Sequence, residues 1–556
     1  MRILDTSTRM IAMVAVALLS QTPAGAADSE PAPVIDVSIQ NKVLNPIDAR
    51  LFGQFMERPS WGSEIGAEAA VVPGTHQLQP EAKRMLRDMQ IPVARFPGGT
   101  DVDYVDWLDM IDNVPGRDAE RPTTVGHTGN RVTNNFGYDE FLRMCEELKI
   151  ESILVVNFRD GLLDKDGPER AAQHAAKLVA YANASTDARL PGDLGLWPKL
   201  RAGNGHPKPY GVKYFQIGNE TWAFWRKASL EHYVKTLEAY IDAIRSVDST
   251  VQIIADGQPV ELATEVYRRL GDRIAYFAVH HYQPWQIREV QRANQTVDAR
   301  DLSAEDIWYA WVSVPRFDAN GQSIFARAEL DLARKANCRV AMTEWNWNGW
   351  WGHPIREHVA LNSLYTKGVG AAGILHAIMR QGDVIQMGAQ SMLIGDGWGI
   401  HAIYCDRHGR SRPYMVPSGQ VTMMYSKHHG DRRLAIDVAN MPHFEQPYRM
   451  AGNRPAERVA YVDVLATRSE KTLYLHTINR HFHQALSLRI DASALENQPN
   501  EEGKMHILEG RLNNDPAVGE SPAPGRVRAE PFVIQDDRFV VRLPARSVAV
   551  VEAPLR

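Results

Sequence analysis

The sequence of 556 residues has few cysteines and few long apolar runs, and neither sign of charge predominates. Its three cysteines, Cys145, Cys338 and Cys405, are too few and too scattered for a disulfide framework or a metal set, although an oxidising compartment would permit one disulfide. With 62 basic and 67 acidic residues the net charge is −5, which offers no basic stripe to nucleic acid. No apolar run after residue 30 is long enough to cross a bilayer. These absences argue against a disulfide scaffold, a nucleic-acid-binding protein and a membrane-spanning protein.

The motifs of several common catalytic sites are also missing. Histidine pairs occur at residues 280–281 and 428–429, but neither has the HExxH spacing of a zinc enzyme. The Pro-Gly-Gly turn at residues 97–99 lacks the pattern of a phosphate-binding loop. No Gly-x-Ser-x-Gly elbow accompanies the predicted strands, which disfavours an acyl-transfer hydrolase. We therefore expect neither a metal nor another cofactor.

The N-terminus has the pattern of an export signal. Arg2 and Arg9 precede or flank an apolar core at residues 10–19 (MIAMVAVALL), which is too short to span a bilayer. Small residues at 24–26 (AGA) then provide a cleavage site. This pattern predicts a signal peptide over residues 1–26 and a periplasmic or secreted protein, with an uncleaved membrane anchor as the alternative.

The rest of the chain is organised around residues 210–225 (YGVKYFQIGNETWAFW). Val212, Tyr214 and Ile217 belong to a short β-branched and aromatic run that predicts a buried strand. The run stops at Gly-Asn-Glu, and a carboxylate at the C-terminal end of a buried strand is where a (β/α)8 barrel holds its catalytic groups. Taken alone, Glu220 could equally be a solvated or helix-capping glutamate.

A second strand of the same kind ends at Thr343-Glu344. The gap between the two glutamates accommodates three strand-and-helix units, which predicts that they sit on strands 4 and 7 of a barrel and face one pocket. Four tryptophans follow Glu344, and flat indole rings suit the faces of a sugar. Two strand-end carboxylates among aromatic residues indicate glycoside hydrolysis by a general acid and a partner carboxylate. The tryptophans are Trp345, Trp347, Trp350 and Trp351.

The alternation of elements predicts an α/β fold, a (β/α)8 TIM barrel over residues 45–410. Eight strand-like runs, near residues 52, 94, 154, 215, 253, 278, 341 and 375, alternate with helical patterns. From residue 411 the sequence changes to short strands separated by Pro-, Gly- and Asn-rich breaks. This second pattern predicts a jelly-roll-like β-sandwich over residues 411–556, which a strand at 34–43 is expected to join.

Five motifs in order along the chain resemble glycoside hydrolase family 51, the retaining α-L-arabinofuranosidases of clan A. The resemblance covers about residues 40–430, and the run that ends in Gly-Asn-Glu is its most specific part. A bare Gly-Asn-Glu would point only to the clan. The motifs are residues 53–57 (GQFME), 95–99 (RFPGG), 204–220 (NGHPKPYGVKYFQIGNE), 280–282 (HHY) and 343–347 (TEWNW).

The resemblance implies that Glu220 is the acid/base and Glu344 the nucleophile. The acid/base needs a raised pKa, whereas the nucleophile must be ionised, which a cation such as Arg95 would favour. From the sequence alone, Arg95 could equally pair with a structural carboxylate. The resemblance further implies that Tyr282 hydrogen-bonds the nucleophile and that Asn219 binds the sugar 2-hydroxyl. It places Glu57, His280, Trp345 and Gln386 with Arg95 among the substrate-binding residues.

Thr100 departs from the family pattern, which usually has an asparagine that contacts the furanose at this position. The sugar specificity is therefore left open. The function implied is an exo-acting retaining α-L-arabinofuranosidase on polysaccharide side chains or oligosaccharides, with homo-oligomerisation undecided. Two alternatives are an endo-β-glucanase or xylanase of the same clan and a non-catalytic carbohydrate-binding barrel. The presence of both Glu220 and Glu344 disfavours the last, because binding alone needs no acid/base pair.

Overall fold

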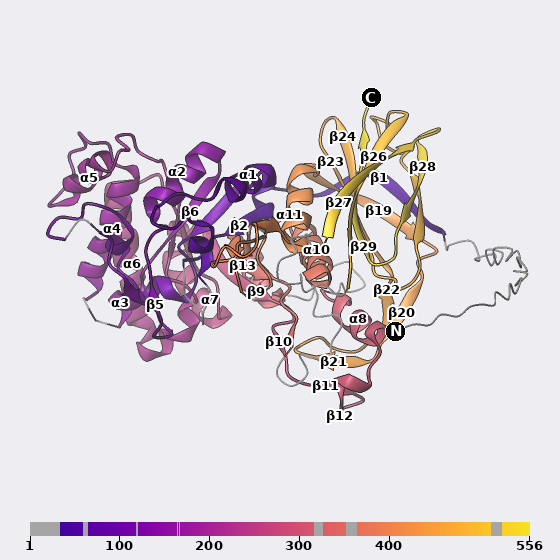
Figure 1. Cartoon of the computed structure of the whole chain (residues 1–556), viewed down its shortest axis with the longest axis horizontal. Helices are drawn as coiled ribbons and strands as arrows, with labels where there is room; N and C mark the ends of the chain where they lie inside the picture. Colours follow the sequence, from indigo (N-terminus) through magenta and orange to yellow (C-terminus); the bar gives the residue numbers. More distant parts are fainter. Residues whose placement is uncertain are drawn as a thin grey trace, which may run out of the picture.

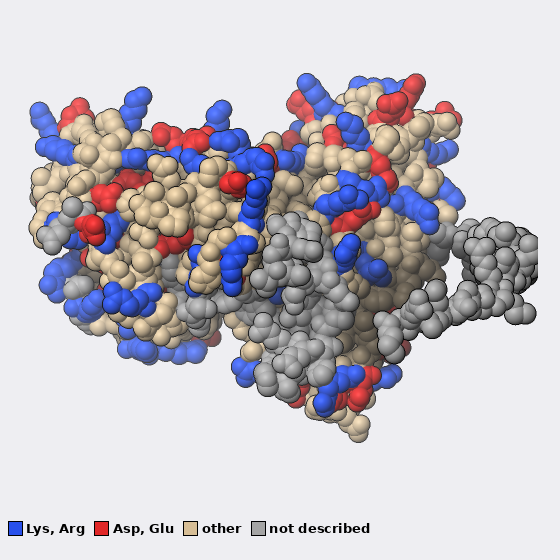
Figure 2. All heavy atoms as spheres, viewed as in Figure 1, with Lys and Arg blue, Asp and Glu red and all other residues tan. Residues whose placement is uncertain are grey.

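The computed structural model describes residues 34–58, 65–117, 120–163, 165, 167–315, 326–351, 364–397, 399–512 and 525–556, with the backbone alone for residues 350 and 351. The predicted signal peptide lies outside the described residues. Figure 1 shows two parts along the long axis of the molecule, a barrel with its helices and a sheet-rich part that holds the C-terminus. On the face drawn in Figure 2, acidic and basic side chains are interspersed. Within the described residues no helix combines the length and apolarity needed to cross a membrane.

Eight parallel strands close into the predicted barrel. Its lower interior is filled by apolar side chains such as Val93, Ile153, Ile254 and Met387, so the barrel is a packed core and leaves the C-terminal strand ends for a site. The strands are β2 (Gly53–Phe55), β3 (Val93–Phe96), β6 (Glu151–Val156), β7 (Tyr214–Ile217), β8 (Gln252–Asp256), β9 (Tyr276–Tyr282), β13 (Arg339–Asn346) and β15 (Ile385–Ser391). In chain order, Glu220 follows the fourth strand and Glu344 lies on the seventh, as predicted.

The surrounding helices begin and end where local sequence signals require. Proline at the first turn starts α1 and α4, where its missing N–H costs no hydrogen bond. Ser229 caps α6 by accepting a hydrogen bond from the His232 N–H at 3.1 Å. The helices are α1 (Pro80–Met89), α2 (Tyr138–Leu148), α4 (Pro168–Asn183), α6 (Leu230–Val247), α7 (Val260–Leu270), α9 (Arg327–Ala336), α10 (Leu364–Arg380) and α11 (Pro417–Lys427).

The prediction of the eighth strand near residue 375 is wrong. Those residues belong to α10, and the strand is β15, about ten residues later. Nearly every residue of α10 is buried, because the helix lies between the barrel and the sheet-rich part (Figure 1). A helix buried on all sides has no polar face, so its apolar run cannot be distinguished from a buried strand by periodicity. The sequence pattern did not predict β15 because its sequence, IQMGAQS, has only one β-branched residue.

The sheet-rich part is built on a nine-stranded sheet in the order β27-β26-β29-β24-β23-β19-β1-β25-β28. The N-terminal strand β1 (Val34–Pro46) joins it, antiparallel to β19 (Arg432–Ala439) and parallel to β25 (Leu486–Asp491). Its edge strands β27 (Gly525–Val533) and β28 (Arg538–Leu543) approach each other, so the sheet folds over on itself. The remaining strands are β23 (Val462–Arg468), β24 (Thr472–Asn479), β26 (Glu502–Gly510) and β29 (Ser547–Pro554).

Helix α11 follows the predicted boundary at residue 411 and contacts both parts of the molecule. It packs against the barrel helices α10 and α1 and against the sheet strands β26, β27 and β29. The first strand of the nine-stranded sheet after it, β19, begins at Arg432.

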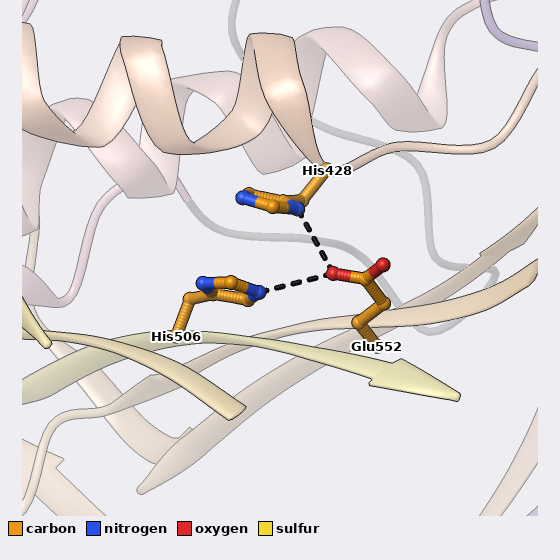
Figure 3. Close-up of side chains that lie close together, drawn as sticks. All are labelled: His428, His506 and Glu552. Carbon is orange, nitrogen blue, oxygen red and sulfur yellow. Dashed lines mark hydrogen bonds and ion pairs between the residues drawn. The ribbon is translucent and has the colours of Figure 1, made fainter. Parts of the chain in front are cut away.

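A histidine–glutamate cluster links the two parts. His428, the C-cap of α11, and His506 on β26 each place a ring nitrogen 3.0 Å from the same oxygen of Glu552 on β29 (Figure 3). The two imidazole rings stack with their centroids 3.8 Å apart. Burial, with His506 close by, lowers the pKa of His428 to about 4. A neutral imidazole can donate one N–H to the carboxylate, so the cluster fastens the end of α11 to the sheet.

All three cysteines are buried and free. Cys145 lies in α2, and Cys338 directly precedes β13. Both therefore behave as the small buried hydrophobes that the sequence predicts.

Candidate active site

One cavity of about 1490 Å³ opens at the C-terminal ends of the barrel strands. Because all eight strands are parallel, their last residues and the loops that follow converge there. Most of the predicted site residues line it: Glu57 after β2, Thr100 after β3, Asn219 and Glu220 after β7, His280 and Tyr282 on β9, and Glu344 on β13.

The chain turns sharply where β7 ends, and this turn presents Glu220 to the cavity. Gly218 has φ +76°, and a Cβ there would lie 2.7 Å from the Thr221 side chain and 2.9 Å from that of Phe158. Glu220 itself has φ 47° and ψ 46°, in the left-handed region that non-glycine residues rarely adopt. Backbone strain of this kind is typical of functional sites, where the surrounding structure fixes it. The Glu220 side chain is 25% exposed.

Glu344 is deeply buried and surrounded by donors. The Arg95 guanidinium donates to Glu344 Oε1 at 2.8 Å, and the Tyr282 hydroxyl donates to Oε2 at 2.8 Å. Burial alone would raise the pKa of Glu344, but the charges of His280 and Arg95 and these hydrogen bonds outweigh it and lower that pKa. The arrangement therefore holds Glu344 as an ionised carboxylate.

His280 lies between the two glutamates. Its Nδ1 is 3.1 Å from Glu220 Oε1 and 3.6 Å from Glu344 Oε2, while its Nε2 lies 3.0 Å from the Thr343 hydroxyl. Burial disfavours the charged ring, but Glu344 and Glu220 outweigh burial and raise the pKa of His280. One oxygen of Glu220 and one of Glu344 lie within 4.8 Å of each other. The two carboxylates can therefore face one atom of a bound molecule.

Arg95 supports the site from behind the cavity. It is fully buried, and besides Glu344 it donates to Gln216 Oε1 at 2.8 Å and to Asn219 Oδ1 at 2.6 Å. The Asn219 N–H donates to Asp103 at 3.1 Å. With its three donor groups used by protein acceptors, Arg95 positions Glu344 and Asn219. A substrate-binding residue would have to be exposed on the cavity wall. Arg95 lies at the site but is not exposed there.

Glu57 reaches the cavity because the residue opposite it is a glycine. Gly99 has φ +70°, and a Cβ at this position would lie 1.8 Å from Glu57 Oε1. Any side chain at residue 99 would therefore displace the Glu57 carboxylate. Thr100 follows at the cavity wall, where the sequence predicts a contact with the sugar.

Two predicted tryptophans face away from the cavity. Trp345 and Trp347 are fully buried between the barrel and its helices. The pleat of β13 explains this, since Glu344 points into the barrel and the next residue points outward. The prediction that Trp345 binds substrate is therefore wrong, and the side chains of Trp350 and Trp351 lie outside the described residues. The described tryptophans that line the cavity are Trp222, Trp225 and Trp285.

Gln386 is also misplaced by the sequence prediction. It is the second residue of β15, whose last residue, Ser391, lines the cavity. A strand rises about 3.3 Å per residue, so Gln386 lies near the opposite end of the barrel. The alignment at this position failed because β15 was not recognised as a strand.

The sequence reasoning missed several lining residues. Trp222 and Trp225 lie within the stretch that organises the chain, and their spacing after Glu220 was an available signal. Gln258 follows β8 and accepts the His280 N–H at 2.9 Å. Lys367 and His401 come from α10 and from the loops after β15, and no motif marks either of them.

Two groups of described residues have side chains close enough to share a metal ion, Glu220–His280–Glu344 and His428–His506–Glu552. In the first group both Glu344 oxygens already accept hydrogen bonds from Arg95 and Tyr282. In the second group one ring nitrogen of His428 and one of His506 face the same oxygen of Glu552. Hydrogen bonding within the protein accounts for each arrangement.

Comparisons with known proteins agree with the predicted family. Residues 85–300 match the family described as the alpha-L-arabinofuranosidase 1 domain. A probable alpha-L-arabinofuranosidase C of Aspergillus clavatus is 31% identical over 186 residues, which are 33% of each chain. An intracellular exo-alpha-L-arabinofuranosidase of Bacteroides ovatus is 26% identical over 245 residues, 42% of this chain and 44% of the relative. The chain thus matches less than half the length of these relatives.

The fold is similar over a much longer stretch. The crystal structure of an alpha-L-arabinofuranosidase from Thermotoga maritima matches with a TM-score of 0.70 and 21% identity over 94% of this chain and all of that one. The architecture of barrel and β-sandwich is therefore shared. The domain match and the relatives agree with the resemblance to α-L-arabinofuranosidases that the five motifs carry.

Proposed function

We propose that the protein is a retaining glycoside hydrolase that releases α-L-arabinofuranosyl groups from oligosaccharides or polysaccharide side chains. The observation that carries the proposal is the pair Glu220 and Glu344, which have oxygens within 4.8 Å at the ends of two barrel strands. Retaining enzymes hold their carboxyl groups about 5–5.5 Å apart, whereas inverting enzymes need roughly 6.5–9.5 Å to admit a water. The spacing favours retention.

The surroundings of the two glutamates support a different role for each. Glu344, ionised by Arg95, His280 and Tyr282, attacks the anomeric carbon and forms a covalent bond to the sugar. Glu220 gives its proton to the departing glycosidic oxygen, then takes a proton from the water that releases the sugar from Glu344. Breaking the bond to Glu344 regenerates both groups, so no cofactor is required.

The lining of the cavity supports a carbohydrate substrate. Trp222 and Trp285 are 48% and 50% exposed, so their indole faces are available to a sugar ring. Asn219 Nδ2 is buried without a hydrogen-bond partner among the described residues. Since its Oδ1 is held by Arg95, the amide N–H₂ is left to donate to a hydroxyl of the bound sugar.

A panel of p-nitrophenyl glycosides tests the substrate. We expect hydrolysis of the α-L-arabinofuranoside above that of the β-D-xyloside and β-D-glucoside, with NMR of the first product showing the anomeric configuration of the substrate. Inversion would contradict the mechanism. Cleavage of β-glucan or xylan in the interior of the chain, without action on the arabinofuranoside, would favour an endo-acting hydrolase instead.

We also propose that the protein is exported after removal of residues 1–26, because of the apolar core and the small residues that follow it. N-terminal sequencing of the mature protein from the periplasm or medium should start at Ala27. Recovery of the uncleaved chain in the cytoplasm would contradict export.

A further inference from the structure

The cavity extends well past the two glutamates on one side. Glu220 must face the departing oxygen, so the leaving group lies toward the loops after β7, β8 and β9, where Trp222, Gln258 and Trp285 line the wall. The sugar retained on Glu344 then lies toward the ends of β15, β2 and β3. On that side the lining continues beyond Glu57 and Thr100 to Lys367 and a small sheet that follows β15.

This sheet supplies an aromatic wall. It consists of β16 (Ile394–Gly395), β17 (Ile403–Tyr404) and β18 (Tyr414–Met415). Tyr404 and Tyr414 are cross-strand neighbours, with ring centroids 5.0 Å apart and an interplanar angle of 31°. Both line the cavity, so they offer apolar ring surface with a hydroxyl at the rim, which is the chemistry that sugars prefer.

His401 is the most unusual residue of this wall. It is only 1% exposed and lines the cavity, yet neither ring nitrogen has a hydrogen-bond partner among the described residues. Its main chain is fixed, since its carbonyl accepts the Ser418 hydroxyl at 3.0 Å. A buried polar group without partners is costly and rare, so an imidazole kept in this position needs a ligand to explain it.

The charge state of His401 indicates the kind of ligand. Burial lowers its pKa to about 4 against the attraction of Asp396, so the ring is neutral near pH 7. A neutral imidazole has one donor and one acceptor, which matches hydroxyl groups better than a carboxylate or phosphate. Lys367, 4% exposed, lines the cavity on the same side. Asp396 is bound by Arg407, whose Nη2 lies 2.6 Å from Asp396 Oδ1.

We propose that Lys367, His401, Tyr404 and Tyr414 form a second sugar subsite on the retained side, so that the enzyme accepts an arabinofuranosyl disaccharide or a longer chain as the glycone. This inference rests on the proposed function. It adds that the retained part of the substrate need not be a single terminal sugar. The ring face of the second sugar lies on the tyrosine wall, and one of its hydroxyl groups binds the imidazole of His401.

The test compares the p-nitrophenyl α-L-arabinofuranoside with the corresponding glycoside of a 1,5-linked arabinofuranosyl disaccharide. We expect the wild type to release the intact disaccharide together with nitrophenol, as separated by chromatography. In His401→Leu, kcat/KM for the disaccharide glycoside should fall relative to that for the monosaccharide glycoside by about 5- to 150-fold, the range for lost hydrogen bonds. Lys367→Met should change this ratio in the same direction.

Thermal unfolding distinguishes binding from a structural role. Since the His401 ring makes no hydrogen bond with the described protein, His401→Leu should not lower Tm. The control is His476→Leu, because His476 is fully buried but lies in the β-sandwich away from the cavity, and it should leave the ratio unchanged. A fall in Tm for His401→Leu with an unchanged ratio would overturn the proposal.

The products separate failure of the subsite from failure of the function. If the wild type cleaves the monosaccharide glycoside but only trims single arabinose units from the disaccharide glycoside, the second subsite is refuted and the proposed activity stands. If it cleaves neither, the activity is refuted and the subsite with it.

Discussion

The ends of β7 and β13 present the same side chain to one cavity in opposite surroundings. Glu344 on β13 is 8% exposed and accepts hydrogen bonds from Arg95 and Tyr282. Glu220 after β7 is 25% exposed and has His280 as its neighbour at 3.1 Å. The first environment stabilises a carboxylate, whereas the second leaves the Glu220 side chain in contact with solvent and with the cavity. Chemically identical residues thus acquire different roles from the donors that the barrel places around them.

Removing Glu344 should have the largest effect, because no covalent intermediate can then form. We expect Glu344→Gln to lower kcat on every glycoside by a factor on the order of 10⁶, as for loss of the nucleophile in other covalent hydrolases. Steady-state rates on activated and unactivated substrates measure this. Glu238→Gln on the exposed face of α6 is the matched control and should retain activity. Substantial turnover by Glu344→Gln would show that the comparison assigns the nucleophile wrongly.

Removing Glu220 should have a smaller effect that depends on the leaving group. Glu220→Ala should slow the hydrolysis of glycosides with poor leaving groups by about 10²–10⁴-fold. It should spare activated aryl glycosides, because their leaving groups need little protonation to depart. Added azide should then restore deglycosylation by replacing the water that Glu220 activates, and mass spectrometry should detect a glycosyl azide. Equal losses on both kinds of substrate would contradict the role of Glu220 as the acid.

Arg95 provides a test of how the two environments differ. Since the charges of His280 and Arg95 lower the pKa of Glu344, Arg95→Met should raise that pKa. The nucleophile then becomes protonated at a higher pH, so the acidic limb of kcat/KM should move to higher pH. Rates on an activated glycoside across the pH range measure this shift.

The matched control for Arg95 is Arg201→Met. Arg201 is also fully buried, but it donates to the carbonyls of Tyr181, His206 and Pro207 and lies outside the cavity. Its loss should lower stability without moving the acidic limb. A raised KM with an unmoved limb in Arg95→Met would instead make Arg95 a substrate ligand.

The sequence was sufficient for the parts of the site that lie on recognisable strands. Glu220 and Glu344 follow short apolar runs, and parallel strands bring such ends together whatever the loops do. Side-chain direction was less accessible, as Trp345 shows, since the residue beside a strand-end carboxylate points to the opposite face. His401 could not be predicted because its unpaired nitrogens follow from packing among segments far apart in the chain. Strand β15 has only one β-branched residue, so the sequence did not predict it and Gln386 was misplaced.

Thr100 should give the smallest effect, because it concerns the sugar and leaves both carboxylates in place. An amide offers a donor and an acceptor, whereas threonine has one hydroxyl on a shorter side chain. A lost buried hydrogen bond costs about 1–3 kcal/mol, or roughly 5- to 150-fold in specificity. We expect weak action of the wild type on p-nitrophenyl α-L-arabinofuranoside, and a gain of this size in kcat/KM for Thr100→Asn. Thr100→Val keeps the shape and removes the hydroxyl, so a further loss in that variant would show that the hydroxyl already binds the sugar. Rapid hydrolysis by the wild type that Thr100→Asn slows would make Thr100 the better ligand, and the specificity would then be set by the hydroxyl and not by the missing amide.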